Sequence, residues 1–257
     1  MSTPDPWNNL RRFTDARIGL GRSGAAQPTR EVLDFTFAHA MARDAVTTPL
    51  DWAPIEGQAS ELGLETIRVA SAAESRGEYL RRPDLGRQLS HSARQALLQH
   101  QDLRPDLLIV VGDGLSSKAV AANFQPFLAA FLPHVRDKNW RLGPVILASE
   151  ARVALGDDAA EALGAKAVVM LIGERPGLSS PDSLGAYLTY QPRTGRKDAD
   201  RNCISNIRAR GLSYDEAAFK LAWLIEHAFK RGLTGVALKD EADYGAHLTA
   251  RSAKQIT

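Results

Sequence analysis

The sequence predicts an α/β fold in which a parallel-sheet domain follows a smaller, mainly helical N-terminal region with an extended arm. Three observations support this prediction. Continuous apolar runs alternate with helical patterns in the second half of the chain, as they do when helices join parallel strands. The first 28 residues carry glycines and prolines that prevent a long helix or strand. The 44% of hydrophobic and 24% of charged residues are typical of a soluble globular protein.

The N-terminal region is predicted to span residues 1–102 and to contact a partner. Its first 28 residues are expected to lie as an arm against another protein, because they cannot form a regular element of their own. No lysine occurs before Lys118, and arginine suits protein interfaces better than lysine does. A GC-rich genome that favours arginine codons is the alternative explanation.

Two helices are predicted in this region. The first begins at Thr29, which can cap it, and continues to about residue 45. The second covers residues 81–101, where Pro83 suits the first turn and leucines and alanines repeat at helical spacing. Between them we expect a loop or short helical turn and then a short extended piece over residues 66–70.

The second domain is predicted over residues 103–257. Residues 106–114, 143–150 and 167–172 are apolar runs of the kind that form strands buried on both faces of a parallel sheet. A further strand is expected at residues 186–191. The helices are expected from Ser116 or Ser117 to residue 137 (with a break or kink at Pro126), over residues 157–163, and from the capping box at residues 213–216 to Gly232. The polar residues after Lys239 are expected to form a mobile tail.

Candidate ligand-binding loops follow the strands, because ligands of open parallel sheets bind outside the carboxyl ends of the strands. These loops are residues 112–117, 148–153 and 173–180, and residues 200–207 are expected to join them as a fourth loop. Glu174 is either a hydrogen-bond acceptor for a ligand or part of an internally paired surface turn. Cys203 is either a nucleophile or a small packed side chain, and the latter is the commoner role of a single cysteine.

A nucleotide-binding module of Rossmann type is the main alternative from another functional class. Gly112 and Gly114 open a helix, but Ser117 stands at the third glycine of the dinucleotide motif. The nearest suitably placed acid is Glu150, which is too far along the chain. A tight strand-to-helix turn explains the glycines equally well.

Several other functions find no support in the sequence. One cysteine cannot form an intrachain disulfide and suits a reducing cytosol, and the six histidines show no metal-ligand spacing. No nucleophile elbow or P-loop is present, so no catalytic residue and no metal site is predicted. A net charge of +2 does not indicate nucleic-acid binding. No apolar run reaches the ~18 residues that a membrane span needs.

Long motifs distributed over the chain resemble the small (light, or β) subunit of ethanolamine ammonia-lyase. The similarity runs from about residue 16 to about residue 232. Its motifs are ARIGLGRSG, YLRRPDLGRQL, VGDGLSSKAVAANF, LGAKAVVMLIGERPGL and DRNCISNI, in that order.

The resemblance implies a subunit of an adenosylcobalamin-dependent lyase that converts ethanolamine to acetaldehyde and ammonia by radical chemistry. The large subunit would bind the substrate, and this chain, through a Rossmann-like domain, would close over the cobalamin at the subunit boundary. The family's cobalamin contacts fall on Val153, Glu174 and Cys203, in the contexts ARV, GERPGL and NCISNI. The resemblance implies a cytoplasmic location, in some members inside a bacterial microcompartment. The short N-terminal segment argues against that targeting route here.

Overall fold

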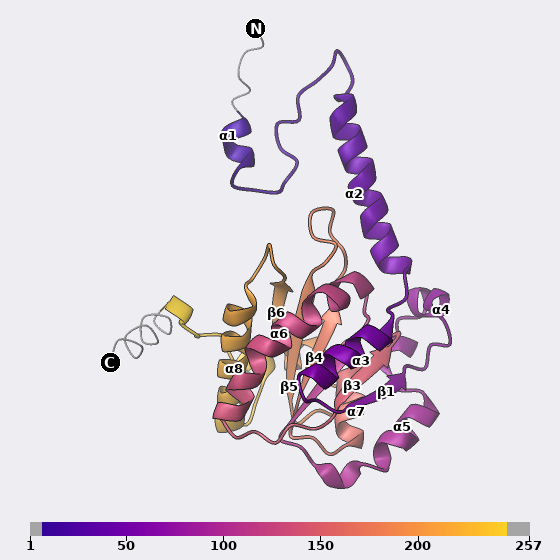
Figure 1. Ribbon diagram of the computed structural model, residues 1–257, viewed down its shortest axis with the longest axis vertical. Coiled ribbons are helices and arrows are strands. Elements are labelled where there is room, and N and C mark those ends of the chain that lie inside the picture. Colours follow the sequence, from indigo (N-terminus) through magenta and orange to yellow (C-terminus); the bar gives the residue numbers. More distant parts are fainter. Residues whose placement is uncertain (1–6, 246–257) are drawn as a thin grey trace.

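A six-stranded sheet with helices on both faces forms the body of the protein (Figure 1). The computed structural model describes residues 7–245, so the end of the predicted tail lies outside the described residues. The strand order is β1-β3-β2-β4-β5-β6. The strands are β1 (Thr66–Ala70), β2 (Leu107–Gly112), β3 (Val145–Ser149), β4 (Ala167–Gly173), β5 (Leu184–Tyr190) and β6 (Asn202–Ile207).

Helices connect the four parallel strands, and three further helices precede β1 in the described residues. The α-helices of the described residues are α1 (Asn8–Arg11), α2 (Thr29–Thr47), α3 (Trp52–Glu61), α4 (Arg76–Arg81), α5 (His91–Leu98), α6 (Ser117–Asp137), α7 (Leu155–Ala162) and α8 (Tyr214–Arg231). The predicted α/β class is therefore confirmed. Thr66–Ala70 precedes residue 103, where the sequence suggested a boundary, and yet pairs with β3 as the edge strand of the common sheet.

The sheet is mixed, which corrects the prediction of a parallel sheet. Strands β1, β3, β2 and β4 are parallel, whereas β5 runs antiparallel to β4 and β6 runs antiparallel to β5. No helix lies between β4 and β5, and a short connection without a crossover returns the chain in the opposite direction. The expectation of a loop over residues 200–207 is also wrong, because Asn202–Ile207 pairs with β5 as strand β6. Most of this segment is β6, in which Ile204 and Ile207 are buried while Cys203 and Ser205 are exposed.

The helix predicted over residues 81–101 is also wrong. It is divided into the end of α4, a short 3-10 turn at Leu85–Arg87 and α5. Leu89 forms a β-bridge with Ser71, just beyond β1, and the Ser90 side chain then caps α5. Pairing with the sheet edge therefore overrides the helical spacing of the leucines. By contrast, Ser116 caps α6 as predicted, and that helix continues through Pro126.

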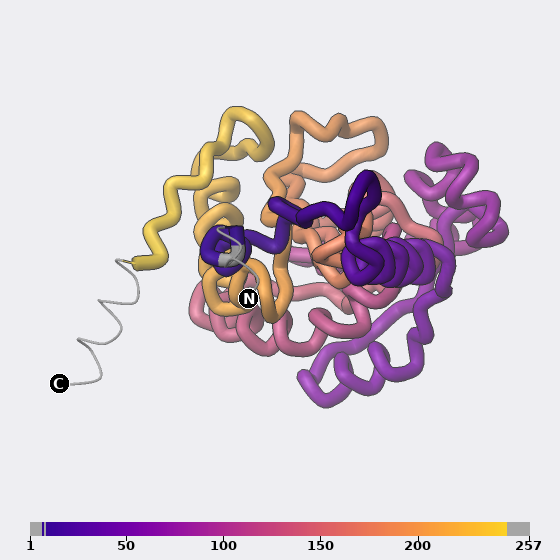
Figure 2. The backbone as a smooth tube through the Cα atoms, turned by 90° about the horizontal axis from the view of Figure 1, so that it is seen from above, coloured from indigo at the N-terminus to yellow at the C-terminus, as the bar shows by residue number. Residues whose placement is uncertain are grey.

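Two hydrophobic clusters lie on opposite faces of the sheet. Helices flank the sheet on both sides (Figures 1 and 2). Helices α3, α6 and α8 cover one face, and α5 and α7 cover the other. Strands β2 and β4 are buried along their whole length, as the continuous apolar runs predicted. Helix α8 is capped by Ser213, whose side chain accepts from the Glu216 amide, and by Gly232, which is in the left-handed conformation.

Helix α2 projects beyond the carboxyl edge of the sheet (Figure 1). The segment that joins α1 to α2 turns back at the level of α2 (Figure 1). This part of the chain exposes most of the large apolar side chains that contact solvent in the described residues. They are Trp7, Leu10, Phe13, Val32, Leu33, Phe35 and Phe37. Leu33 and Phe37, one helical turn apart on α2, are 62% and 68% exposed.

A buried ion pair fastens the start of β6 to α7. Arg201 Nη2 lies 2.5 Å from Asp157 Oδ2, and each side chain is 2% exposed. We expect Arg201→Gln to lower the free energy of unfolding by about 3 kcal/mol, because it leaves a buried carboxylate without its cation. Urea unfolding followed by circular dichroism measures this change.

The matched control is Arg82→Gln, which breaks the Arg82–Asp84 pair on the surface, where the side chains are 60% and 57% exposed. The control is expected to unfold at the wild-type urea concentration, because exposed ion pairs add little stability. An equal effect of the two substitutions would contradict this role for the buried pair.

Candidate functional site

The three predicted loops lie together at the carboxyl edge of the parallel strands. The Leu115 amide donates to the Gly173 carbonyl at 2.9 Å, which joins the loops after β2 and β4. The Ala151 amide donates to Asp113 Oδ1 at 3.0 Å, which joins the loops after β2 and β3. The edge is therefore one connected structure.

Close backbone contact explains the glycines at this edge. Gly114 has a φ of +58°, and a Cβ there would lie 2.3 Å from the Gly173 carbonyl oxygen. A Cβ on Gly173 would lie 2.0 Å from the Ser116 carbonyl oxygen. The glycine pattern that suggested a dinucleotide motif thus has a structural cause in the packing of two loops.

Glu174 follows β4 directly, and its carboxylate accepts hydrogen bonds from two serines and a backbone amide. Ser183 Oγ lies 2.5 Å from Oε2, and Ser205 Oγ lies 2.7 Å from Oε1. The Asn206 amide lies 3.3 Å from Oε2. The side chain therefore ties the loop after β4 to β6, while Oε1, which accepts from Ser205 alone among the described residues, retains acceptor capacity.

Cys203 lies on the exposed edge strand β6, directly opposite Tyr187 of β5. The two side chains lie close enough to influence each other's pKa. Partial desolvation raises the pKa of the Cys203 thiol, and the Glu174 carboxylate raises it further, against the opposing effect of the neighbouring Tyr187 hydroxyl. A thiol with a raised pKa is a poor nucleophile, which favours the packed or contacting role over the catalytic one.

Val153 lies just before α7 and lines a hollow of 390 Å³. The hollow is lined by Pro83, Arg87, Arg152, Val153, Ala154, Tyr187 and Asp198. Tyr187 thus shares a hollow with Val153 and pairs with Cys203 across β5 and β6. A Cβ on Gly185 would lie 2.9 Å from both Glu174 Oε1 and the Tyr187 ring, so these two side chains approach each other over Gly185.

Tyr187 therefore connects the three residues that the sequence singled out, and sequence reasoning missed it. The signal was present: residues 186–191 were expected to form a strand, and alternate residues of a strand share a face. Ser183 and Ser205, which hold the Glu174 carboxylate, were missed as well. Their roles depend on the antiparallel pairing of β5 with β6, which the sequence did not predict.

A second group of charged side chains lies around the Tyr79 ring. Arg76 Nη1 lies 3.1 Å from both Asp113 Oδ2 and Glu150 Oε2. Its guanidinium and that of Arg152 lie over the fully buried Tyr79 ring, at 4.8 Å and 4.3 Å from the ring centre. Burial raises the pKa of Asp113 to about 6, although the Arg76 charge opposes the shift. Arg76 also donates to the carbonyl of Val46, so this group links α2 to the sheet edge.

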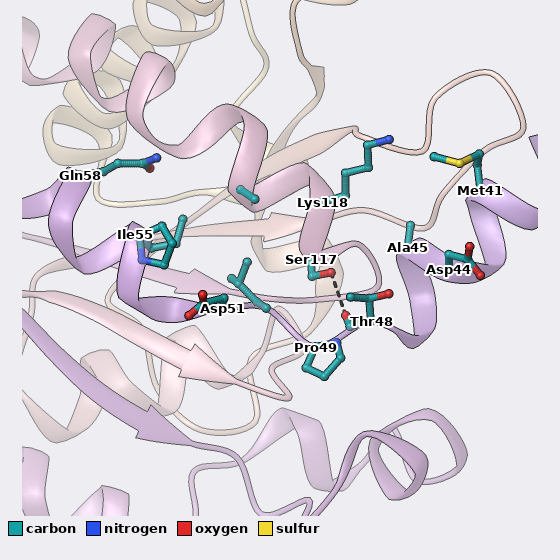
Figure 3. A pocket seen from close by; sticks show the side chains of 13 residues that line it. Met41, Asp44, Ala45, Thr48, Pro49, Asp51, Ile55, Gln58, Ser117 and Lys118 are labelled. Atoms are coloured by element: carbon teal, nitrogen blue, oxygen red, sulfur yellow. Dashed lines mark hydrogen bonds between the residues drawn. The ribbon is translucent and has the colours of Figure 1, made fainter.

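Another hollow, of 340 Å³, lies where α2, α3 and the start of α6 meet (Figure 3). Its lining includes Met41, Ile55 and Lys118, and the Ser117 hydroxyl donates to the Thr48 carbonyl beside it at 2.8 Å (Figure 3). None of Val153, Glu174 and Cys203 lines it. It marks the joint between α2 and the body of the protein.

Residues 7–245 contain no group of three or more histidine, cysteine or acidic side chains that could hold a metal ion. In that same part of the chain no helix has the length and apolar character to cross a bilayer.

Comparisons with known proteins agree on one family. A family model described as "Ethanolamine ammonia-lyase light chain (EutC)" matches residues 4–239. The ethanolamine ammonia-lyase small subunit of Pseudomonas fluorescens strain SBW25 is 53% identical over 246 residues, which cover 94% of this chain and 89% of that protein. The small subunit of Rhodopseudomonas palustris strain BisA53 is 51% identical over 255 residues, which cover 98% of each chain.

Asp113→Asn is expected to change how stability depends on pH. The folded-state pKa of about 6 lies above the value of about 3.9 for an unfolded chain, so the folded protein binds this proton more tightly. The contribution of Asp113 to the free energy of unfolding is therefore greatest below about pH 4 and is lost as the pH rises through about 6. The asparagine variant should lack this dependence, which amounts to at most about 1.4 kcal/mol per pH unit.

Urea unfolding of both proteins at about pH 5 and about pH 7 measures the difference. The exposed Asp240→Asn variant serves as the control and should keep the wild-type dependence. If Asp113→Asn also keeps it, Asp113 does not titrate in this range.

Proposed function

The chain belongs to the family of ethanolamine ammonia-lyase light chains, and on this premise we propose that it closes an adenosylcobalamin site at the boundary with the enzyme's large subunit. As a small subunit of ethanolamine ammonia-lyase it is part of a lyase that releases ammonia from ethanolamine. The observation that carries the proposal is the gathering of Val153, Glu174 and Cys203 around Tyr187 at one edge of the sheet. Residues so far apart in sequence gather at an edge where ligands of α/β proteins bind.

The residues at this edge fit a cobalamin. The periphery of a corrin carries amide groups, and the free acceptor capacity of Glu174 Oε1 suits their N–H donors. The exposed Cys203 and the half-buried Val153 would contact the macrocycle from two sides. When bound, the cofactor supplies the radical that starts the deamination. This chain's own residues hold and orient the cofactor, and the substrate site belongs to the large subunit.

The partner is proposed to dock on the N-terminal surface formed by Trp7, Leu10, Phe13 and the exposed side of α2. Several large apolar side chains exposed together on neighbouring segments are typical of a protein interface. Arg17 lies over the Phe35 ring, and arginine is common at such interfaces. The Arg76 group connects α2 to Glu150, close to Val153, so a partner held by α2 would lie near the cofactor site.

The sheet domain is proposed to be Rossmann-like in its parallel part. Strands β1, β3, β2 and β4 are joined through helices that alternate between the two faces, as in doubly wound folds. A cytoplasmic location is proposed from the family resemblance and the single cysteine.

Reconstitution tests the function directly. The isolated chain should produce no acetaldehyde from ethanolamine, and a mixture with the large subunit and adenosylcobalamin should produce it. Coupled reduction of the aldehyde measures the rate. Full activity of the chain alone, or an inactive mixture, would reject the proposal.

In the same mixture Phe37→Ser should lower the yield of complex in size-exclusion chromatography. The matched control is Val236→Ser, because Val236 is 80% exposed and lies far along the chain, beyond α8.

Glu174→Ala is expected to weaken binding of the cofactor to the assembled enzyme. The loss of a hydrogen bond to a charged acceptor should cost roughly 1.5–3 kcal/mol of binding free energy, which absorption titration with cobalamin measures.

Two controls separate this contact from a structural role. Ser205→Ala removes an anchor of Glu174 but keeps the carboxylate, and should have the smaller effect. Glu241→Ala removes an exposed carboxylate elsewhere and should have none. Unchanged affinity of Glu174→Ala would exclude Glu174 from the site.

A further inference from the structure

The hollow beside Val153 has a basic lining. Arg87 and Arg152 both line it, and Asp198 is its only acidic residue. An adjoining hollow of 460 Å³ shares Arg87, Ala154 and Asp198 with it and adds Arg196 and Lys197. The two hollows thus form a basic cleft next to Tyr187, with four cationic side chains and one anionic side chain along its wall.

Arg152 carries a charge that the described residues do not neutralise. No carboxylate of residues 7–245 lies within ion-pair distance of its guanidinium. The one hydrogen bond of its side chain to these residues runs from Nη2 to the Tyr79 carbonyl, at 3.4 Å. Its Nε is buried without a hydrogen-bond partner among these residues. The Tyr79 ring holds the guanidinium in place from one side, so the group is positioned but its charge is left for another partner.

The Arg87 guanidinium is also available to bind an anion. Its side chain is 54% exposed, and its nearest carboxylate among the described residues is Asp198, at 3.8 Å. Asp198 Oδ1 already accepts a hydrogen bond from Arg201 Nη1 at 2.8 Å. A distance of 3.8 Å is too long for a hydrogen bond, so the Arg87 donors are free to bind an anion.

We propose that this cleft is an anion subsite that takes the phosphodiester of the cofactor's nucleotide tail, with Arg87 and Arg152 as its ligands. The inference rests on the proposed function, because it is the neighbouring Val153 and Tyr187 that place a cobalamin beside the cleft. The side chains of the corrin are neutral amides, whereas the phosphodiester is anionic. Guanidinium groups recognise such oxygens with charge-assisted, bidentate hydrogen bonds.

Comparison of two corrinoids on the assembled enzyme tests the subsite. Cobinamide keeps the corrin and its amides but lacks the nucleotide and the bridging phosphodiester. We expect Arg87→Gln and Arg152→Gln each to weaken the binding of hydroxocobalamin by about tenfold, as the loss of a charge-assisted hydrogen bond does. The binding of cobinamide should stay unchanged. Arg152→Lys, which keeps the cation, should restore part of the affinity. Absorption titration gives the dissociation constants without any measurement of activity.

Three outcomes would overturn the subsite: variants that bind hydroxocobalamin as the wild type does, variants that lose affinity for both corrinoids equally, and a wild type that binds both corrinoids equally well. Arg231→Gln, on an exposed residue in the last turn of α8, is the matched control and should change neither constant. Inorganic phosphate should compete with hydroxocobalamin but not with cobinamide if the cleft binds the phosphodiester. A wild-type complex that binds neither corrinoid would reject the proposed function itself, and with it the subsite.

Discussion

The contact between the backbones of Gly114 and Gly173 is the constraint on which the ligand-binding edge depends. A side chain on either residue would collide with a carbonyl of the opposite loop, at 2.3 Å for Gly114 and 2.0 Å for Gly173. The loop after β2 can therefore lie directly on the end of β4. Glu174 is the next residue, so the same contact determines where its carboxylate begins. The serine hydrogen bonds then direct that carboxylate toward β6.

The sequence predicted those parts of the fold in which local pattern and tertiary packing agree. Strands β2 and β4 are fully buried, and continuous apolar runs carry that information. The Ser116 cap and Gly232 mark helix ends through purely local chemistry. Residues 81–101 show the opposite case, because their helical spacing gives way to a bridge between Leu89 and Ser71, a contact across the fold. Segment 200–207 was missed because a polar edge strand has little hydrophobic signal of its own.

The candidate site divides in the same way. Position in the chain was enough to place Glu174, because the edge at which a parallel strand ends follows from the direction of β4. The resemblance supplied Val153 and the role of Cys203 as a contact, but neither it nor spacing revealed Tyr187, Ser183 or Ser205. These three residues belong to β5, its entry or β6, the antiparallel part of the sheet that the sequence did not predict. An error in topology thus became an omission in the site, since cross-strand neighbours can be named only when the pairing is known.

The distribution of charge distinguishes positions that stabilise the fold from positions that await a ligand. Arg201 is buried, the Arg76 side chain is 11% exposed, and both have carboxylate partners, so their charges are neutralised within the chain. Arg152 is fixed against Tyr79 but has no such partner among the described residues, and Arg87 has only a distant one. A protein that neutralises the guanidiniums of Arg76 and Arg201 has no stability reason to leave the half-buried Arg152 unpaired, because an uncompensated charge with limited access to water is costly. An anion that binds from outside the chain would neutralise the Arg152 charge and offset this cost. A subunit that forms one wall of a shared cofactor site is expected to present such an unpaired charge to the cofactor.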